Sequence, residues 1–219
     1  MSLVNVNQKS SDMESIYKVS SDPWGNGERK LYERLLGSTA QKLISILDDK
    51  DIDVEDSEWF DIGCGGGNVT RGFIHNLGVT PHYKGCDISK SALVSIADLY
   101  ESVYELDLDT FVPSPSVPWS NSDVVTLVEV LYYTGQRRPW KQNLEFIVDG
   151  MKEHAILVVA DGLVRSQYRD YLKSSSKVKL LDSYTIPEPI CEEVSPTGKK
   201  WHRYLKVRLY EKVGDTRDC

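Results

Sequence analysis

Glycine concentrates at one point of the sequence, in the segment 61–68, which reads DIGCGGGN. An apolar run precedes the segment and apolar residues at helical spacing follow it, so we predict a strand, a glycine turn and a helix. Glycine lets the backbone approach a bound ligand closely. A dinucleotide-binding G-x-G-x-x-G motif would require glycine at position 68, where the chain has Asn68. The spacing found here, G-x-G-x-G with Asp61 two residues before Gly63, argues against that class of site.

Three further acidic residues follow predicted strands. Asp87 ends the strand predicted over 82–87, Asp107 ends the next over 102–107, and Glu129 follows a buried strand over 123–128. Ligands of open α/β sheets bind at the carboxyl ends of strands where the strand order reverses, so we expect one shared crevice. Asp87 lies about 20 residues after the glycine turn, the distance at which a carboxylate accepts hydrogen bonds from ribose hydroxyls.

Each feature alone has a simpler interpretation. Glycine clusters end ordinary helices, and a single aspartate caps a helix or a turn more often than it binds a ligand. The glycine turn and the three acidic residues each follow an apolar strand, and their order along the chain favours the shared site. Cys64 and Cys86 end neighbouring strands and are expected to be buried thiols rather than a redox pair, and the four cysteines lack zinc-site spacing, so no metal is expected.

The remaining chain alternates helical and strand patterns. Residues 1–27 are polar with isolated aromatic side chains and are interpreted as an arm or lid, and residues 28–219 as a single domain. Late strands over 177–185 and 201–212 lack an intervening helix and predict an antiparallel edge hairpin. Alternation along the second strand predicts Leu205, Val207 and Leu209 facing inward and Lys206, Arg208 and Tyr210 facing outward. Further elements are predicted as helices over 31–47, 89–99, 140–151 and 165–172, and as a strand over 155–160.

Composition limits the class of partner. The 219 residues carry a net charge of −7, which disfavours bulk binding of nucleic acid. No basic leader and no apolar stretch of about 20 residues is present in the sequence, so we expect a cytoplasmic protein that does not enter membranes.

These motifs resemble class I S-adenosylmethionine-dependent methyltransferases over most of the chain. The resemblance implies a Rossmann-like, doubly wound α/β fold with a mostly parallel seven-stranded sheet, and S-adenosylmethionine as cofactor with S-adenosylhomocysteine as product. It places Asp107 near the adenine amine, Ile88 and Leu108 beside the ring, and Glu129 near the sulfonium and the acceptor. The cofactor-binding residues it implies are Asp61, Gly63, Cys64, Gly65, Gly67, Asp87, Ile88, Asp107, Leu108, Glu129 and Trp24.

Catalytic candidates lie after the fourth strand. Glu129, Tyr132 and Tyr133 are the candidates there, with His202 as a further base. Core or lid aromatics are the alternative interpretation of Tyr132 and Tyr133. Because methyl transfer from a sulfonium is a direct displacement, alignment of nucleophile, methyl carbon and sulfur is the main requirement.

A narrower similarity involves the segments 22–25, 31–34 and 129–133, which resemble nodulation-type N-methyltransferases that act on the amino sugar of a chitooligosaccharide. It implies that the arm, with Tyr17, Trp24 and Tyr32, folds over the cofactor and helps to form the acceptor pocket. We therefore expect methyl transfer to a small-molecule or saccharide acceptor, with an amine nitrogen as one candidate. The alternatives are a methyltransferase acting on RNA or protein through the basic residues Lys206, Arg208 and Lys212, and a non-catalytic scaffold.

Overall fold

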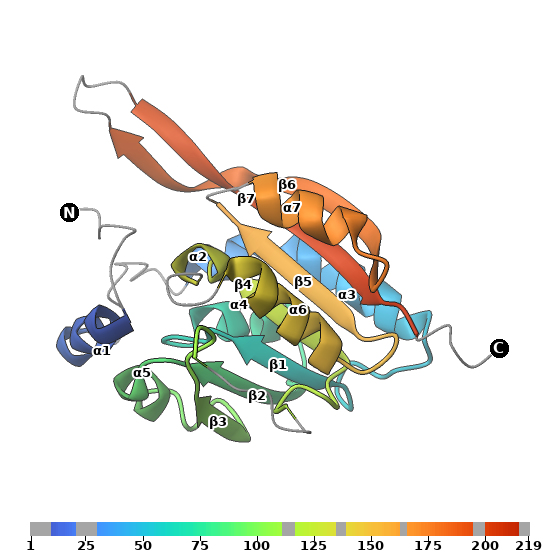
Figure 1. The fold of residues 1–219 in the computed structure, drawn as a ribbon, viewed down its shortest axis with the longest axis horizontal. Coiled ribbons are helices and arrows are strands. Elements are labelled where there is room, and N and C mark those ends of the chain that lie inside the picture. The colour runs from blue at the N-terminus through green and yellow to red at the C-terminus, as the bar shows by residue number, and fades with distance from the viewer. Residues whose placement is uncertain are drawn as a thin grey trace.

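A computed structural model describes residues 10–20, 30–110, 117–134, 139–162, 166–194 and 200–214. Its centre is a seven-stranded sheet with the order β3-β2-β1-β4-β5-β7-β6 (Figure 1). Neighbouring strands pair in parallel except β7, which is antiparallel to both β5 and β6. The strands are β1 (Glu58–Ile62), β2 (His82–Asp87), β3 (Ser102–Glu105), β4 (Val124–Val128), β5 (Ile156–Asp161), β6 (Val178–Val194) and β7 (Lys200–Lys212). The predicted fold class is confirmed.

Helices cover both faces of the sheet, with α3 and α4 behind it and α6 and α7 in front in Figure 1. Their bounds are α1 (Ser10–Val19), α2 (Lys30–Leu35), α3 (Gly37–Asp48), α4 (Asn68–Leu77), α5 (Lys90–Val94), α6 (Trp140–Gly150) and α7 (Ser166–Ser174), with a 3₁₀ turn, η1, at Leu131–Tyr133. Every residue of β4 and β5 is buried, as continuous apolar strands between two helical layers require.

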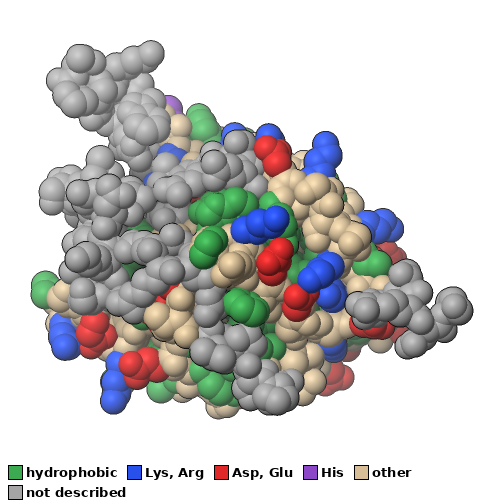
Figure 2. All heavy atoms as spheres, viewed as in Figure 1, with side chains coloured by type: hydrophobic (Ala, Val, Ile, Leu, Met, Phe, Trp, Pro, Cys, Tyr) green, Lys and Arg blue, Asp and Glu red, His purple; other side chains and the backbone are tan. Residues whose placement is uncertain are grey.

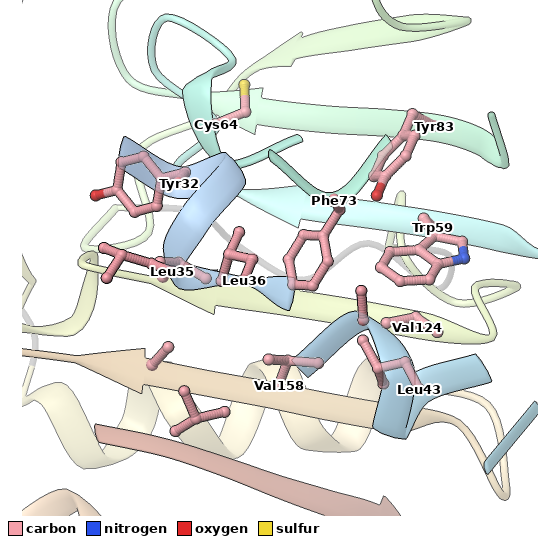
Figure 3. Close-up of a cluster of buried hydrophobic side chains, with 14 of the residues drawn as sticks. Tyr32, Leu35, Leu36, Leu43, Trp59, Cys64, Phe73, Tyr83, Val124 and Val158 are labelled. Atoms are coloured by element: carbon pink, nitrogen blue, oxygen red, sulfur yellow. The ribbon is translucent and has the colours of Figure 1, made fainter. Parts of the chain in front are cut away.

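One core cluster lies between the sheet and the helices α2, α3 and α4 (Figure 3). The Trp59 ring lies 5.4 Å from the ring centres of both Phe73 and Tyr83, so strands β1 and β2 and helix α4 share an aromatic centre. Tyr32 of α2 joins the edge of this cluster, and its hydroxyl points away from the aliphatic side chains. The cluster therefore fixes α2 beside the glycine turn without using the polar end of Tyr32.

Two predicted helices differ clearly from the structure in their bounds, and one helix was not predicted. The helix predicted over 31–47 is divided into α2 and α3 at Leu36, and the helix predicted over 89–99 ends at Val94. The arm contains a helix, α1, that the polar sequence did not indicate. Contacts of α1 with α5 supply what its weak apolar pattern lacks, because helices in proteins are stabilised mainly by tertiary packing.

The outward face predicted for the last strand is wrong at two positions. Leu205, Val207 and Leu209 are buried as expected, but Arg208 and Tyr210 are also buried, at 8% and 1% exposure. Strand β7 lies between β5 and β6 and not at the sheet edge, and Tyr210 packs in the core cluster with Tyr168 and Leu172 of α7. The expected basic face is therefore not continuous.

The β6–β7 hairpin extends beyond the rest of the sheet. Strand β7 pairs with β5 only from Lys206 to Glu211, whereas its pairing with β6 continues to Lys200. We call this extra length, residues 186–194 and 200–205, the hairpin extension. It projects past the carboxyl end of β5, toward the same side of the view as α1 (Figure 1). Among the described residues, no helix is long and apolar enough to cross a membrane.

Candidate functional site

The strand order reverses between β1 and β4, and the glycine turn follows β1 at this point. The backbone N–H groups of Gly63 and Cys64 both donate to the carbonyl of Cys86, at 2.7 and 3.0 Å. Gly63, Gly65 and Gly67 all have positive φ, at 75°, 48° and 73°. The turn is therefore joined to the end of β2 in a backbone conformation that favours glycine.

The three glycines have different neighbours. A Cβ at Gly63 would collide with Val130, and one at Gly67 would lie 2.8 Å from both Arg71 and Leu99, so packing alone requires glycine at these two positions. A Cβ at Gly65 would collide with the hydroxyl of Tyr17, which belongs to α1. The space above Gly65 thus faces a separate helix and not the core of the domain.

Asp87 is the acidic residue joined directly to the turn. Its carboxylate accepts hydrogen bonds from the backbone N–H of Gly65 at 3.0 Å and of Ser89 at 2.8 Å. Burial raises the pKa of Asp87, and the backbone N–H groups of Ser89, Gly65 and Ile88 oppose that shift. A carboxylate offers about four lone-pair directions, so these three donors leave acceptor capacity on a partly exposed side chain.

Asp61 lies beneath the turn and is only 2% exposed. Its carboxylate accepts hydrogen bonds from the hydroxyls of Thr126 at 2.7 Å, Thr70 at 2.8 Å and Tyr100 at 3.2 Å. Burial raises its pKa to about 6, and the three hydroxyls act in the opposite direction. This carboxylate therefore ties β1, α4 and β4 together, which makes Asp61 a positioning residue for the turn.

The end of β3 lies next to the end of β2, because the N–H of Leu106 donates to the carbonyl of Asp87 at 3.0 Å. Asp107 follows immediately, and its carboxylate accepts from the N–H of Asp109 at 2.9 Å. Ile88 and Leu108 are both partly buried. The residues predicted to surround an adenine ring therefore belong to adjacent strand ends on one edge of the sheet.

Glu129 follows β4 at the same edge, where its N–H donates to the carbonyl of Ala160 at 2.8 Å. It has a φ of 59°, a conformation that costs free energy for a non-glycine residue and that clusters at functional sites. Its carboxylate accepts from the N–H of Gly162 and lies 3.3 Å from Nη2 of Arg203. Side-chain exposures of 12% for Glu129 and 19% for Arg203 make this a partly buried ion pair.

Three tyrosines from other elements lie near this pair. Burial raises the pKa of the Tyr32 hydroxyl, and the charges of Glu129 and Arg203 and the hydroxyls of Tyr133 and Tyr17 all act on it. These electrostatic influences place side chains of α1, α2, η1, β7 and the residue after β4 near one another. We call Tyr17, Tyr32, Glu129, Tyr133 and Arg203 the mouth cluster.

The hairpin extension closes one side of the mouth cluster. A Cβ at Gly162, one residue after β5, would lie 2.7 Å from Ile190 and 3.1 Å from Arg203. On the other side of the extension, Nε of Arg34 lies 2.8 Å from the carboxylate of Glu188, which connects α2 to β6. Helix α2 and the end of β5 are thus both in contact with the hairpin extension.

Sequence reasoning missed two contributors to this arrangement. Glu14, whose carboxylate accepts hydrogen bonds from the hydroxyls of Ser89 and Ser91 beside Asp87, belongs to no motif, and no local pattern indicates that Arg203 pairs with Glu129. The sequence offers one weak signal for Glu14, which lies three positions before Tyr17 in the arm. Trp24 and the side chain of Tyr132 lie outside the described residues, and His202 is exposed on the hairpin extension. The ligand roles of the site residues remain predictions.

The described part of the chain has one group with the chemistry of metal ligands, Glu58, His82 and Glu101, at the opposite edge of the sheet. His82 contacts Glu101, and the ammonium of Lys84 lies 2.6 Å from the carboxylate of Glu58. These contacts form surface ion pairs far from the glycine turn. Burial raises the pKa of the Cys64 and Cys86 thiols, which disfavours thiolate chemistry at the turn itself.

The sequence matches no protein-family model, and no curated protein is significantly similar to it. Solved structures are similar in fold. The N-methyltransferase NodS from Bradyrhizobium japonicum WM9, in complex with S-adenosyl-L-homocysteine, has a TM-score of 0.63 and 15% identity over 94% of this chain and 99% of that chain.

Two further structures show the same similarity. A chain from the complex between the Haloferax volcanii Trm112 methyltransferase activator and a methyltransferase has a TM-score of 0.60 and 14% identity over 94% of this chain and 99% of that chain. The plantazolicin methyltransferase BpumL, in complex with a monoazolic substrate analogue and S-adenosylhomocysteine, has a TM-score of 0.57 and 13% identity over 95% and 99% of the two chains. This protein therefore has the class I methyltransferase fold.

Proposed function

We propose that the protein is a methyltransferase that uses S-adenosylmethionine and transfers its methyl group to a small-molecule or saccharide acceptor. The observation that carries the proposal is the Gly65–Asp87 hydrogen bond at the point of strand reversal. It joins a turn whose central glycine faces an external helix to a partly exposed carboxylate. This is where an α/β sheet of this order binds its ligand.

The residues present fit the adenosyl group. Asp87 keeps acceptor capacity for ribose hydroxyls, and its raised pKa indicates that the carboxylate would gain from further donors. Ile88 and Leu108 offer apolar surface for the adenine ring, and Asp107 offers an acceptor for its amine. The sulfonium of the bound cofactor would supply the electrophilic methyl group, and the acidic edge favours a cation.

The chain's own contribution to the reaction is alignment. Direct displacement requires the nucleophile on the side of the methyl group opposite the sulfur, so the walls of the acceptor pocket decide the rate. The mouth cluster provides such walls, with hydroxyls from three tyrosines and the Glu129–Arg203 pair. Hydroxyl donors and acceptors with aromatic rings suit a polar acceptor such as a sugar or an amine.

Glu129 is better suited to hold the hairpin extension than to remove a proton. Its carboxylate already accepts from Gly162 and is paired with Arg203, and both contacts favour its charged form without freeing it to move. An amine acceptor would therefore bind with its lone pair already available, or transfer its proton to another group. Glu129 is therefore a positioning residue in this proposal, and Tyr133 stays a catalytic candidate.

A nucleic-acid acceptor has less support. Arg208 is buried and Arg203 is paired with Glu129, so they do not form a basic stripe with Lys206. On the face shown in Figure 2, basic and acidic side chains are interspersed. Phosphate binding by neutralised charges would need a clustered basic surface.

The test begins with ligand binding. S-adenosylhomocysteine should raise the melting temperature of the protein and NAD should not, because only a ligand that binds the folded state stabilises it. Radiolabelled S-adenosylmethionine is then incubated with a panel of amines, amino sugars, chitooligosaccharides and total RNA at two salt concentrations. Stabilisation by NAD alone would contradict the proposal, and labelling of RNA that falls steeply with salt would favour the nucleic-acid alternative.

A further inference from the structure

Helix α1 is attached to the loop that follows Asp87 by one side chain. The carboxylate of Glu14 accepts hydrogen bonds from the hydroxyls of Ser91 at 2.7 Å and Ser89 at 2.8 Å, and from the N–H of Ser91 at 3.2 Å. The hydroxyl of Ser89 is also 3.2 Å from the N–H of Ala92, as the N-cap of α5. Glu14 therefore bridges α1 to the first turn of α5, where a negative charge is favourable.

The strength of this attachment appears in the acidity of Glu14. The hydroxyls of Ser91 and Ser89 and the N–H of Ser91 lower its pKa to about 2. The carboxylate therefore stays charged at any physiological pH. Lys18, on the next turn of α1, lies 3.6 Å from Glu14 and is largely exposed, so the serines and not this ion pair account for most of the contact.

The same helix covers the glycine turn. Tyr17 lies one helical turn after Glu14, and its hydroxyl fills the space that the missing side chain of Gly65 leaves open. Gly63 and Gly67 face packed side chains within the domain, so Gly65 is the glycine of the turn that a ligand could reach from outside. A ligand that approaches Gly65 must pass the position of Tyr17.

Both contacts of α1 converge on the residues proposed to hold the cofactor. Asp87 accepts from Gly65 and from Ser89, and Ser89 donates to Glu14. The described residues 10–20 are separated from α2 by nine residues outside the description, and α1 packs mainly against α5. Loss of the Glu14 contact would therefore release α1 without breaking the sheet or its core.

We infer that α1 is a gate of the cofactor site, held shut by Glu14 on Ser89 and Ser91, with Tyr17 seated over Gly65. This inference rests on the proposed function. A gate slows the binding and the release of a ligand to a similar degree, whereas a residue that only contacts the ligand changes mainly its release.

The experiment measures association and dissociation rate constants of S-adenosylhomocysteine by stopped flow, with the full chain. Glu14→Gln should raise both rate constants by about tenfold and change Kd by less than about threefold, because the charged contact to three donors is lost. Tyr17→Ala should raise the association rate by clearing the space over Gly65. Ser91→Ala should show a smaller effect on both rate constants. The double variant Glu14→Gln/Ser91→Ala should have the rate constants of Glu14→Gln, since the Glu14–Ser91 contact is already lost there.

Lys18→Ala is the matched control, because it removes a charge from the same helix and leaves the serines in place. Its rate constants should stay within about twofold of the unmodified chain. Hydrogen exchange gives an independent readout: amides of α1 should exchange faster in Glu14→Gln, and those of β4 should not change.

Unchanged rate constants, or a faster release with Kd weakened by the same factor, would overturn the gate and leave the proposed function intact. Absence of S-adenosylhomocysteine binding by the unmodified chain and by every variant would overturn the proposed function and the gate together. The two failures are therefore distinguishable.

Discussion

The two sides of the site are built in different ways. The turn side, formed by the glycine turn and Asp87, is held by backbone N–H groups, which donate to the carbonyl of Cys86 and, from Gly65, to the carboxylate of Asp87 22 residues away. The mouth side depends on side chains from five elements, and its Glu129–Arg203 pair joins residues 74 apart. In the proposed function, local backbone geometry would therefore set where the cofactor binds, whereas distant side chains would shape the acceptor site.

Similarity of fold bears differently on the two sides of the site. Backbone contacts of a strand-turn-helix unit depend on glycine and on strand register, and similar sequences of elements reproduce them. Side-chain pairs such as Glu129–Arg203 depend on the length of a hairpin and on which residues it carries. The fold alone therefore does not identify the acceptor, and variants can separate the two sides.

The largest effect is expected for Gly65→Val on the turn side. A branched side chain would collide with Tyr17 and would have to adopt a φ of 48°, so binding of S-adenosylhomocysteine should weaken by about a hundredfold or more. Isothermal titration calorimetry measures this. Gly78→Ala is the control, because Gly78 also has positive φ but faces open space at the end of α4. Equal loss in both variants would indicate a general folding defect.

Asp61→Asn should change how stability depends on pH. Burial raises the pKa of Asp61 from 3.8 in its unperturbed form to about 6, so the folded state holds this proton more tightly than the unfolded chain. Tighter proton binding by Asp61 stabilises the folded state fully below about pH 3.8. This stabilisation, up to about 3 kcal/mol, is lost as pH rises through about 6.

Urea unfolding at pH values from 4 to 7 tests this prediction. The free energy of unfolding of the unmodified chain should fall relative to that of Asp61→Asn as pH rises, because the amide does not titrate. Parallel curves of unfolding free energy against pH for the two proteins would show that burial does not raise the pKa of Asp61. The turn side would then owe less to this buried carboxylate than the structure indicates.

Asp87→Ala should weaken binding of S-adenosylhomocysteine by about thirtyfold, because Gly65 and Ser89 lose a charged acceptor along with the ligand contact. Turnover at saturating cofactor should survive, since ribose contacts are equal in the ground and transition states. Glu105→Ala is the matched control, because Glu105 pairs with Asp87 in the sheet register but is exposed. Normal binding by Asp87→Ala would show that the end of β2 is wrongly assigned.

Arg203→Met tests the mouth side and should have the smallest effect on the cofactor. Its Kd for S-adenosylhomocysteine should stay within about twofold of the unmodified chain. The kcat/KM for the methyl acceptor should fall by about tenfold, because the hairpin extension loses its contact with Glu129. Lys206→Met on the exposed side of the same strand should leave both values unchanged. A loss of cofactor affinity equal to the loss of turnover would show that the two sides are not separate.

Periodicity and glycine spacing predicted most of the fold because they report local geometry. The segment 61–68 indicated the turn, and the apolar runs that form β4 and β5 indicated buried central strands. The exposed face of β7 was mispredicted because alternation along one strand does not reveal that a helix covers its other side, as α7 covers Tyr210.

The sequence alone determined the order of strands and helices, the glycine turn and the three acids after strands β2, β3 and β4. These depend on neighbours in the chain and on the alternation of polar and apolar residues. Only the tertiary structure decided that Tyr17 faces Gly65, that Glu14 contacts two serines 75 and 77 residues away, and that Arg203 pairs with Glu129. Contacts between side chains distant in sequence depend on how the packed elements are placed, and no local pattern encodes that placement.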